Sequence, residues 1–307
     1  MARVFIDGSA GTTGLRIRER LARRKDLELI ILPEEVRKDP SARAEALNSA
    51  DVSFLCLPDA AAEEAVSFVT DPHAVIIDTS TAHRTAEGWT YGMPELTGQR
   101  EKIARAQRIA NPGCHATGFI ALVAPLVENG LISPDARLSC FSLTGYSGGG
   151  KKMIAEYEAA DVDPLLRAPR QYGLGQKHKH LPEMAAVCGL NHMPVFCPVV
   201  APYYAGMEVT VPLTPDETSA SPEEIRKVYQ DYYRSGLIRF AEEPDENGFL
   251  SAGAMAGRDN LEVSVFGNDE RILLISRFDN LGKGASGAAI QNMNIVLGLD
   301  EAEELVK

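Results

Sequence analysis

The sequence has no long hydrophobic run. Its longest apolar stretch, residues 118–127, is short and contains Pro125, whereas a transmembrane helix needs about 20 apolar residues. The N-terminal residues also lack the succession of charged, apolar and small residues that marks a signal peptide. We therefore expect no membrane association and a cytoplasmic location.

Paired cysteines are missing as well. The sequence has five cysteines, an odd number, and none of them forms a Cys-x-x-Cys pair. This pattern is typical of a reducing compartment, in which thiols stay free. We expect one or two of the five to be chemically active and the others to be small core residues. The five are Cys56, Cys114, Cys140, Cys188 and Cys197.

The chain has no surplus of basic residues. It holds 31 Lys and Arg against 43 Asp and Glu, which gives a formal net charge of −12. An acidic surface argues against nucleic acids and anionic membranes as partners. It still permits a local basic pocket, so we expect a small-molecule substrate and an anion such as phosphate.

The first part of the chain alternates between strand and helix patterns. At 307 residues the chain is long enough for two domains. Apolar runs at 4–6, 27–32, 52–57, 74–77 and 108–110 alternate with helical patterns at 13–24, 41–48 and 60–69. This alternation predicts βαβ units and a parallel sheet with helices on both faces.

The pattern changes near residue 112. Helices are predicted at 116–129 and 222–235, and longer strands at 136–144, 195–204, 207–211, 261–267 and 271–278. Such a succession of strands indicates a mixed or antiparallel sheet. Segments 145–152 and 242–248 are expected to be mobile loops. A last helix, 286–297, is expected to return to the first domain.

A glycine-rich loop follows the first strand and begins the first helix. It comprises Gly8, Ser9, Ala10, Gly11, Thr12, Thr13 and Gly14. Glycines let the backbone approach a pyrophosphate, and the helix N-terminus offers it free N–H groups. The spacing is G-x-x-G-x-x-G rather than G-x-G-x-x-G, so a glycine turn without a ligand is the alternative. The strand before it and the helix after it favour a dinucleotide site.

The segment after the second strand contains both acids and bases. An acid such as Glu34 or Glu35 would bind the ribose hydroxyl of NAD. A base such as Arg37 or Lys38 would bind the 2′-phosphate of NADP, or would simply be solvated. The residues alone leave the choice between NAD and NADP open.

Cys114 is predicted to be a nucleophile. The sequence Asn111-Pro112-Gly113-Cys114 places its thiol in the first turn of a helix. A helix N-terminus stabilises an anion and favours the thiolate. The alternative is an inert, buried cysteine at a helix start.

A basic segment with two histidines supplies candidates for an acid or base. Residues 177–183 read Lys-His-Lys-His-Leu-Pro-Glu, with His178 and His180 as the candidates. One of them can deprotonate Cys114 and move a proton at the reacting carbon. The alternatives are an exposed basic loop, or a metal site that also involves His192 and nearby cysteines. No standard zinc spacing is present, so we expect no metal.

A second glycine-rich segment, 144–152, contains Ser147, Lys151 and Lys152. Its backbone N–H groups are suited to a phosphate or a carboxylate. A plain flexible loop is the alternative.

The chain resembles a known family over nearly its whole length. It is similar to the N-acetyl-gamma-glutamyl-phosphate reductases of the shorter type, within the aspartate-semialdehyde dehydrogenase superfamily. The shared motifs are G-S-A-G-T-T-G at 8–14, D-T-S-T-A-H-R at 78–84, Y-G-M-P-E-L at 91–96, N-P-G-C-H-A-T at 111–117, T-G-Y-S-G-G-G-K at 144–151, H-K-H-L-P-E at 178–183 and D-N-L-G-K-G-A-S-G-A-A-I-Q-N-M-N at 279–294.

The resemblance implies an α/β fold with two domains. A Rossmann-type NADP-binding domain would comprise 1–113 and 284–307, and an α+β domain for catalysis and subunit contact would comprise 114–283. It implies a homo-oligomer, either a dimer or a tetramer. The implied site residues are Cys114, His178 and His180 for catalysis; the loop 8–14, Arg37, Ser80, Asn280 and Gly284 for the cofactor; and Asn111, Ser147, Lys151, Lys177 and Glu183 for the substrate.

The resemblance also implies the reaction. Cys114 would attack N-acetylglutamyl phosphate, and NADPH would reduce the resulting thioester to the semialdehyde. The same chemistry on aspartyl phosphate or a carrier-linked aminoadipyl phosphate is an alternative. A redox-sensing binding protein, in which Cys114 is oxidised, is another.

Overall fold

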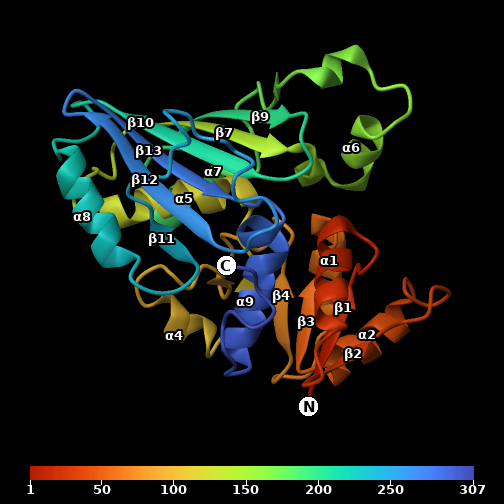
Figure 1. The fold of residues 1–307 in the computed structure, drawn as a ribbon. Helices are drawn as coiled ribbons and strands as arrows, with labels where there is room; N and C mark the ends of the chain where they lie inside the picture. Colours follow the sequence, from red (N-terminus) through yellow and green to blue (C-terminus); the bar gives the residue numbers. More distant parts are fainter. The chain divides into compact units, whose positions relative to one another are not determined.

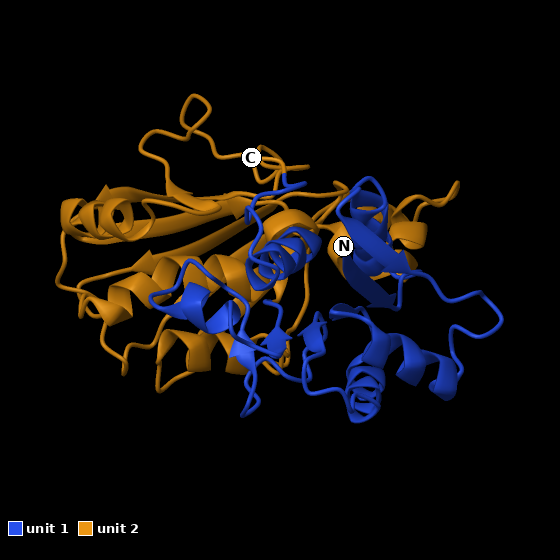
Figure 2. Ribbon diagram, turned by 90° about the horizontal axis from the view of Figure 1, so that it is seen from below, with its two compact units in different colours: residues 1–112, 285–305 blue, residues 113–284, 306–307 orange.

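The computed structural model describes residues 1–307, and the chain divides into two compact units (Figures 1 and 2). Unit 1 is Met1–Pro112 with Ala285–Leu305, and unit 2 is Gly113–Gly284 with Val306–Lys307. The expected division differs from this one by one residue at each junction and by two residues at the chain end. Residues 306–307 group with unit 2 because Val306 and Asp259 exchange two hydrogen bonds, of 2.6 and 2.9 Å.

Unit 1 is built on a six-stranded parallel sheet with the strand order β2-β1-β3-β4-β6-β5. The strands are β1 (Ala2–Asp7), β2 (Leu27–Ile30), β3 (Val52–Leu55), β4 (Val75–Asp78), β5 (Thr90–Tyr91) and β6 (Arg108–Ala110). The helices are α1 (Thr12–Leu21), α2 (Pro40–Ser49), α3 (Asp59–Ser67), α4 (Gln99–Ile103) and α9 (Gly287–Val296). The predicted Rossmann-type architecture is confirmed.

Helices cover both faces of this sheet. Because successive strand residues point to opposite faces, Val4 and Phe5 of β1 enter different cores. Val4 packs with Ile17 of α1 and Met293 of α9. Phe5 packs with Leu47 of α2 and with alanines of α3. The last helix of the chain therefore completes the core of unit 1.

Unit 2 is built on a seven-stranded mixed sheet with the strand order β11-β12-β13-β10-β7-β9-β8. The pairs β7–β9 and β11–β12 are parallel and the others antiparallel. The strands are β7 (Ser139–Gly145), β8 (Arg170–Gln171), β9 (Val195–Ala201), β10 (Met207–Leu213), β11 (Ile238–Phe240), β12 (Leu261–Asn268) and β13 (Arg271–Phe278). The helices are α5 (Cys114–Glu128), α6 (Gly150–Tyr157), α7 (Leu181–Cys188) and α8 (Pro222–Tyr232).

Helix α5 lies in the interior of unit 2, packed closely on the sheet. Gly118 permits this approach, because a Cβ there would lie only 2.5 Å from a methyl carbon of Val209 on β10. On another side, Tyr229 of α8 donates its hydroxyl hydrogen to the carbonyl of Leu122 at 2.6 Å. The helix is thus fixed between the sheet and α8, which fixes its first residue, Cys114.

The sequence patterns do not predict every element. Segment 145–152 was expected to be a mobile loop, and this is wrong: Tyr146–Gly149 is a 3-10 helix and α6 begins at Gly150. The residues after the glycines, 151–157, include several good helix formers, which explains the difference. The short elements β5, β8, β11, α4 and α7 were not predicted. No helix of the structure is long and apolar enough to cross a membrane.

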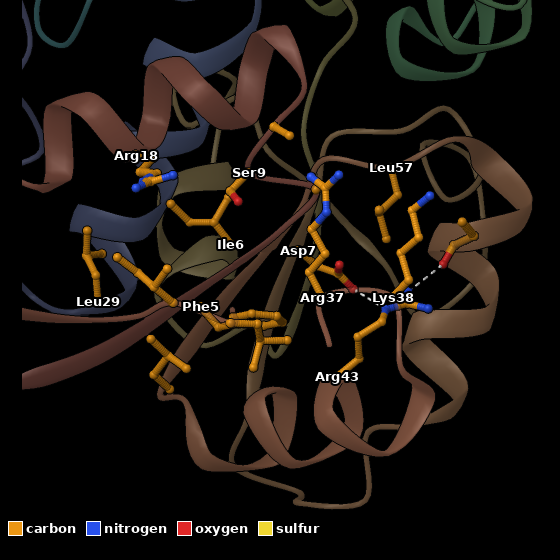
Figure 3. Close-up of a pocket in the computed structure, with 16 residues that line it drawn as sticks. Phe5, Ile6, Asp7, Ser9, Arg18, Leu29, Arg37, Lys38, Arg43 and Leu57 are labelled. Carbon is orange, nitrogen blue, oxygen red and sulfur yellow. Dashed lines mark hydrogen bonds and ion pairs between the residues drawn. The ribbon is translucent and has the colours of Figure 1, made fainter. Parts of the chain in front are cut away.

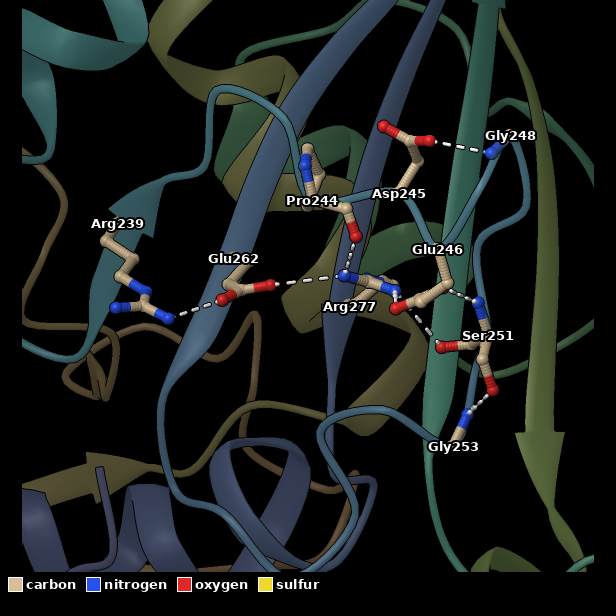
Figure 4. A network of polar contacts seen from close by, with 9 residues as sticks. All are labelled: Arg239, Pro244, Asp245, Glu246, Gly248, Ser251, Gly253, Glu262 and Arg277. Carbon is tan, nitrogen blue, oxygen red and sulfur yellow. Dashed lines mark hydrogen bonds and ion pairs between the residues drawn. The ribbon is translucent and has the colours of Figure 1, made fainter.

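Arg277 of β13 anchors the segment that precedes β12. Its guanidinium donates to the carboxylate of Glu246 and to the carbonyl of Pro244, both at 2.7 Å, and lies 3.5 Å from Glu262 (Figure 4). Arg277 is buried. Segment 242–248, expected to be mobile, is therefore tied to the sheet by a buried cation.

Candidate active site

The glycine loop between β1 and α1 is packed closely against the backbone at the end of β3. Gly8 has a φ of +85°, and a Cβ there would lie 2.3 Å from the carbonyl oxygen of Cys56. A Cβ at Gly14 would lie 2.5 Å from the carbonyl oxygen of Gly8. Both positions therefore require glycine. Gly11 is the N-cap of α1, and no side chain caps the helix there, so its free N–H groups remain available to an anion.

A pocket of about 320 Å³ adjoins this loop (Figure 3). Four cationic residues line it: Arg18, Arg37, Lys38 and Arg43. Arg43 donates to the buried carboxylate of Asp7 at 2.9 Å, and Arg37 pairs with Glu34 at 2.5 Å. Apolar residues of β2 form another wall. The pocket therefore combines an apolar surface with positive charge, and the predicted residue Arg37 lies in it.

Two other predicted ligand contacts are hydrogen-bonded within unit 1. Ser80 donates its hydroxyl hydrogen to Asp78 at 2.7 Å. The side chain of Asn111 donates to the carbonyl of Ala285 at 3.0 Å and accepts from Asn292 at 3.3 Å. Both residues are buried. Their polar groups thus have protein partners, and the ligand contacts expected of them stay predictions.

Cys114 is the first residue of α5, which begins two residues before the predicted start at 116. Gly113 is the N-cap, and no side chain caps this helix. Cys114 is half-buried. Gly284 lies against it, because a Cβ at Gly284 would be 3.0 Å from the Cβ of Cys114. A half-buried thiol at an uncapped helix start is in a position that favours the thiolate.

Three of the other cysteines are in positions that disfavour ionisation. Burial raises the pKa of Cys56 to about 12, and burial also raises the pKa values of Cys140 and Cys188. Cys197 is half-buried on β9. No group of three or more His, Cys, Asp or Glu side chains is arranged to hold a metal ion.

His115 is a site residue that the sequence analysis did not single out. It is 2% exposed and follows Cys114 directly. Its Nδ1 lies 2.6 Å from the hydroxyl of Ser142 on β7, and its Nε2 lies 2.6 Å from the hydroxyl of Tyr172. Burial, with a smaller contribution from His178, lowers the pKa of His115 to about 3. Its place beside Cys114, the predicted nucleophile, was the only signal in the sequence.

The two histidines of the predicted H-x-H pair meet His115. The ring centre of His115 lies 5.8 Å from that of His178 and 5.6 Å from that of His180. The two H-x-H rings are 4.7 Å apart, and Phe196 packs on His178 at 5.1 Å. The structure thus brings the predicted acid or base to the residue next to Cys114.

Tyr172, which the sequence analysis also missed, closes this cluster. Its ring is 5.8 Å from that of His178. Burial, followed by the charge at Cys114, raises the pKa of Tyr172. Nothing in the local sequence marks this tyrosine, because its hydrogen-bond partner His115 lies 57 residues earlier in the chain.

Glu183 connects α7 to the start of α5. Its Oε1 accepts the backbone N–H of Gly113 at 2.8 Å, and the side chain is 1% exposed. The substrate contact expected of Glu183 stays a prediction, while its contact with the helix start is structural.

The remaining predicted residues of unit 2 divide into buried and exposed ones. Asn280 donates to the hydroxyl of Ser147 at 3.0 Å and accepts from the backbone N–H of Gly206 at 3.0 Å. Lys151, on α6, and Lys177, before α7, are exposed. The lysines are therefore free to move, whereas Asn280 and Ser147 hold each other.

Comparison with known proteins identifies the family. Residues 3–106 match the model described as semialdehyde dehydrogenase, NAD binding domain, and residues 114–280 match that of the semialdehyde dehydrogenase dimerisation domain. The chain belongs to the semialdehyde dehydrogenase family. It is 45% identical to N-acetyl-gamma-glutamyl-phosphate reductase 2 of Nostoc sp. over 97% of this chain and 98% of the relative. It is 46% identical to N-acetyl-gamma-glutamyl-phosphate reductase of Brucella suis over 96% of this chain and 99% of the relative.

Solved structures share the fold. Aspartate semialdehyde dehydrogenase II of Vibrio cholerae has a TM-score of 0.74 at 17% identity, over 97% of this chain and 99% of that one. Aspartate semialdehyde dehydrogenase of Candida albicans, solved with NADP, has a TM-score of 0.69 at 14% identity, over 97% and 99%. The resemblance to reductases of the N-acetyl-gamma-glutamyl-phosphate type, expected from the motifs, is confirmed.

Proposed function

We propose that the protein reduces N-acetylglutamyl phosphate to N-acetylglutamate semialdehyde, with release of phosphate, in arginine biosynthesis. One observation carries the proposal: Cys114 begins an uncapped helix beside a cluster of histidines, in a chain 45% identical to reductases of that name. A thiol so placed is suited to attack an activated carboxyl group.

The residues of unit 1 fit a nicotinamide dinucleotide. Gly8 and Gly14 keep side chains out of the loop, as a closely bound pyrophosphate requires. The hydroxyl of Thr12, in the first turn of α1, is buried without a hydrogen-bond partner, and a phosphate oxygen would satisfy it. When bound, the dinucleotide supplies the hydride.

NADP is the form we propose. Arg18, Arg37 and Lys38 line the pocket beside the end of β2, where the adenosine ribose lies in Rossmann-type domains. A 2′-phosphate gains charge-assisted hydrogen bonds from such residues. Glu34 forms an ion pair with Arg37, but it does not neutralise Arg18 or Lys38. This supports NADP, although NAD can bind the same loop.

Cys114 carries the acyl group in the proposed mechanism. Its sulfur forms a bond to the acyl carbon, and the bond from that carbon to the phosphate oxygen breaks, so phosphate leaves with the electron pair. The thioester on Cys114 is then a good acceptor for the hydride and is sheltered from water. When the carbon–sulfur bond breaks, the aldehyde leaves and the thiolate is restored.

The H-x-H pair moves the protons in this proposal. His178 is half-buried beside His115 and Tyr172, and we propose it as the acid or base, with His180 as a substrate contact. The exposed ammonium groups of Lys151 and Lys177 suit the phosphate and the distal carboxylate. Asn111 and Glu183 are proposed to support the substrate through the backbone that they hold, and Ser147 through its hydrogen bond with Asn280.

We propose a homo-oligomer, at least a dimer, formed through the sheet of unit 2. Phe141, Val195 and Leu273 are 48%, 57% and 40% exposed. The strand register puts all three on one face, opposite the face that α5 covers. An exposed apolar sheet face marks a contact surface. The match of 114–280 to a dimerisation domain supports a second copy as its partner.

A steady-state assay tests this function. We expect phosphate-dependent reduction of NADP with N-acetylglutamate semialdehyde, and almost none after Cys114→Ser, which still binds NADPH. Aspartate semialdehyde in the same assay tests the rival substrate class. A protein that binds NADPH but turns over neither aldehyde would be a sensor, and the proposal would be wrong.

A further inference from the structure

His115 has a hydrogen-bond partner at each ring nitrogen. Nδ1 faces the hydroxyl of Ser142 and Nε2 faces the hydroxyl of Tyr172, both at 2.6 Å. The ring is 2% exposed, and a pKa lowered to about 3 keeps it neutral near pH 7. In a neutral imidazole one nitrogen donates and the other accepts. One of the two hydroxyls must therefore donate to the ring, and the other must accept from it.

The environment of Ser142 determines which hydroxyl donates and which accepts. Its side chain is fully buried, and His115 is the hydrogen-bond partner that the structure gives its hydroxyl. If Nδ1 carried the proton, the hydroxyl hydrogen of Ser142 would be buried without an acceptor. A buried donor that has no acceptor costs the full free energy of its desolvation. Ser142 therefore donates to Nδ1, and the ring proton is on Nε2.

This tautomer leaves the hydroxyl hydrogen of Tyr172 available. Nε2–H donates to the oxygen of Tyr172, so Tyr172 cannot donate back to His115. The phenol lies at the edge of His178 and senses the charge at Cys114. Its O–H can therefore donate to an acyl group held on Cys114.

We propose that His115 is a positioning residue, whose Nε2–H tautomer makes Tyr172 a hydrogen-bond donor to the acyl oxygen on Cys114. That oxygen gains negative charge when the thioester is reduced, and a donor aimed at it stabilises the transition state. The role of Tyr172 rests on the proposed function. The tautomer of His115 does not.

Nuclear magnetic resonance tests the tautomer directly. Long-range ¹H–¹⁵N spectra of the full chain, labelled at histidine nitrogens, distinguish the two neutral forms and the imidazolium. The signal of His115 is assigned by its loss in His115→Gln. We expect the neutral Nε2–H form from pH 5 to pH 8. An Nδ1–H form or a protonated ring would overturn the proposal, whatever the substrate proves to be.

A double-mutant cycle tests whether His115 acts through Tyr172. We expect Tyr172→Phe to lower kcat by about 10²-fold with little change in KM, as for the loss of one oxyanion donor. His115→Leu should lower kcat by roughly tenfold alone but add little to Tyr172→Phe. His115→Gln, whose amide N–H can replace Nε2–H, should recover most of the loss.

A purely structural role predicts a different result. The effects of His115→Leu and Tyr172→Phe would then multiply, and His115→Gln would not recover kcat. If His115→Leu does not fold, Ser142→Ala replaces it in the cycle, because it keeps the ring but removes the donor to Nδ1. Multiplying effects in either cycle would overturn the proposal. An inactive wild type with the Nε2–H tautomer would instead refute the proposed function alone.

Discussion

The carboxylate of Glu183 accepts the backbone N–H of Gly113 at 2.8 Å. Gly113 precedes Cys114, and Glu183 is in the first turn of α7, directly after the H-x-H pair. One buried hydrogen bond therefore joins the N-P-G-C motif to the H-x-H-x-P-E motif. This hydrogen bond brings the two motifs together although they are far apart in the chain.

Replacing Glu183 should loosen this connection. Glu183→Ala leaves a buried N–H without an acceptor, and we expect the free energy of unfolding to fall by about 1–3 kcal/mol, with a loss of activity. Glu183→Gln keeps an acceptor oxygen, so it should lower the free energy of unfolding and the activity less than Glu183→Ala does. Urea unfolding and kcat measure the effects, with Glu223→Ala, an exposed residue in the first turn of α8, as the control. Equal stability of both Glu183 variants and wild type would contradict the argument.

The pocket of unit 1 makes a prediction about cofactor choice. We expect kcat/KM to favour NADPH over NADH at least tenfold, since a charge-assisted hydrogen bond contributes about 1.5 kcal/mol or more. Arg37→Ala should reduce this preference, while Arg23→Ala, at an exposed position outside the pocket, should not. A wild-type preference for NADH would instead indicate that Glu34 or Glu35 binds the ribose hydroxyl.

The fold could be predicted from the sequence largely because its patterns are local. The glycine loop, the alternation of strands and helices and the buried helix that begins at Cys114 each follow from residues within a few turns of one another. Short elements such as β5 and α4 have too few residues for a pattern. The glycines of 148–150 were wrongly taken to indicate a loop, because α6 begins at Gly150 and continues through the helix formers that follow.

The candidate site was predictable only where a motif marks it. Cys114, His178 and His180 stand in recognisable motifs, whereas Tyr172 is identified only by its hydrogen bond to His115, 57 residues away. Asn280 and Ser147 show the opposite case, in which two motif residues hydrogen-bond to each other. Tertiary contacts of this kind depend on strand register and helix packing, which spacing in the sequence does not encode.

The buried neutral state of His115 predicts a pH dependence of stability. Its pKa is about 3 in the folded chain and near 6.5 when unfolded. Only the unfolded chain binds the proton between these values, so this contribution is complete above pH 6.5 and declines as the pH falls. Relative to His115→Gln, wild type should lose about 2 kcal/mol of unfolding free energy between pH 7 and pH 5.

Urea unfolding at several pH values measures this difference. His73→Gln is the matched control, since His73 is exposed and its loss should leave the pH profile unchanged. Parallel profiles for wild type and His115→Gln would show that His115 is already protonated in the folded protein at mild pH. The neutral Nε2–H tautomer proposed for His115 would then be wrong too.

We expect the H-x-H pair to act by proton transfer and one histidine to do most of it. Attack of a thiolate on an acyl phosphate needs no metal, because phosphate is a good leaving group. General acid–base catalysis contributes about 10² to 10⁴ in rate. We therefore expect His178→Asn to lower kcat on that scale with a modest change in KM, and His180→Asn mainly to raise KM, as for a substrate-positioning residue. Activity should survive dialysis against a chelator. Loss of activity on chelation and recovery with zinc would establish a metal site. Near wild-type kcat in both variants would place the base elsewhere.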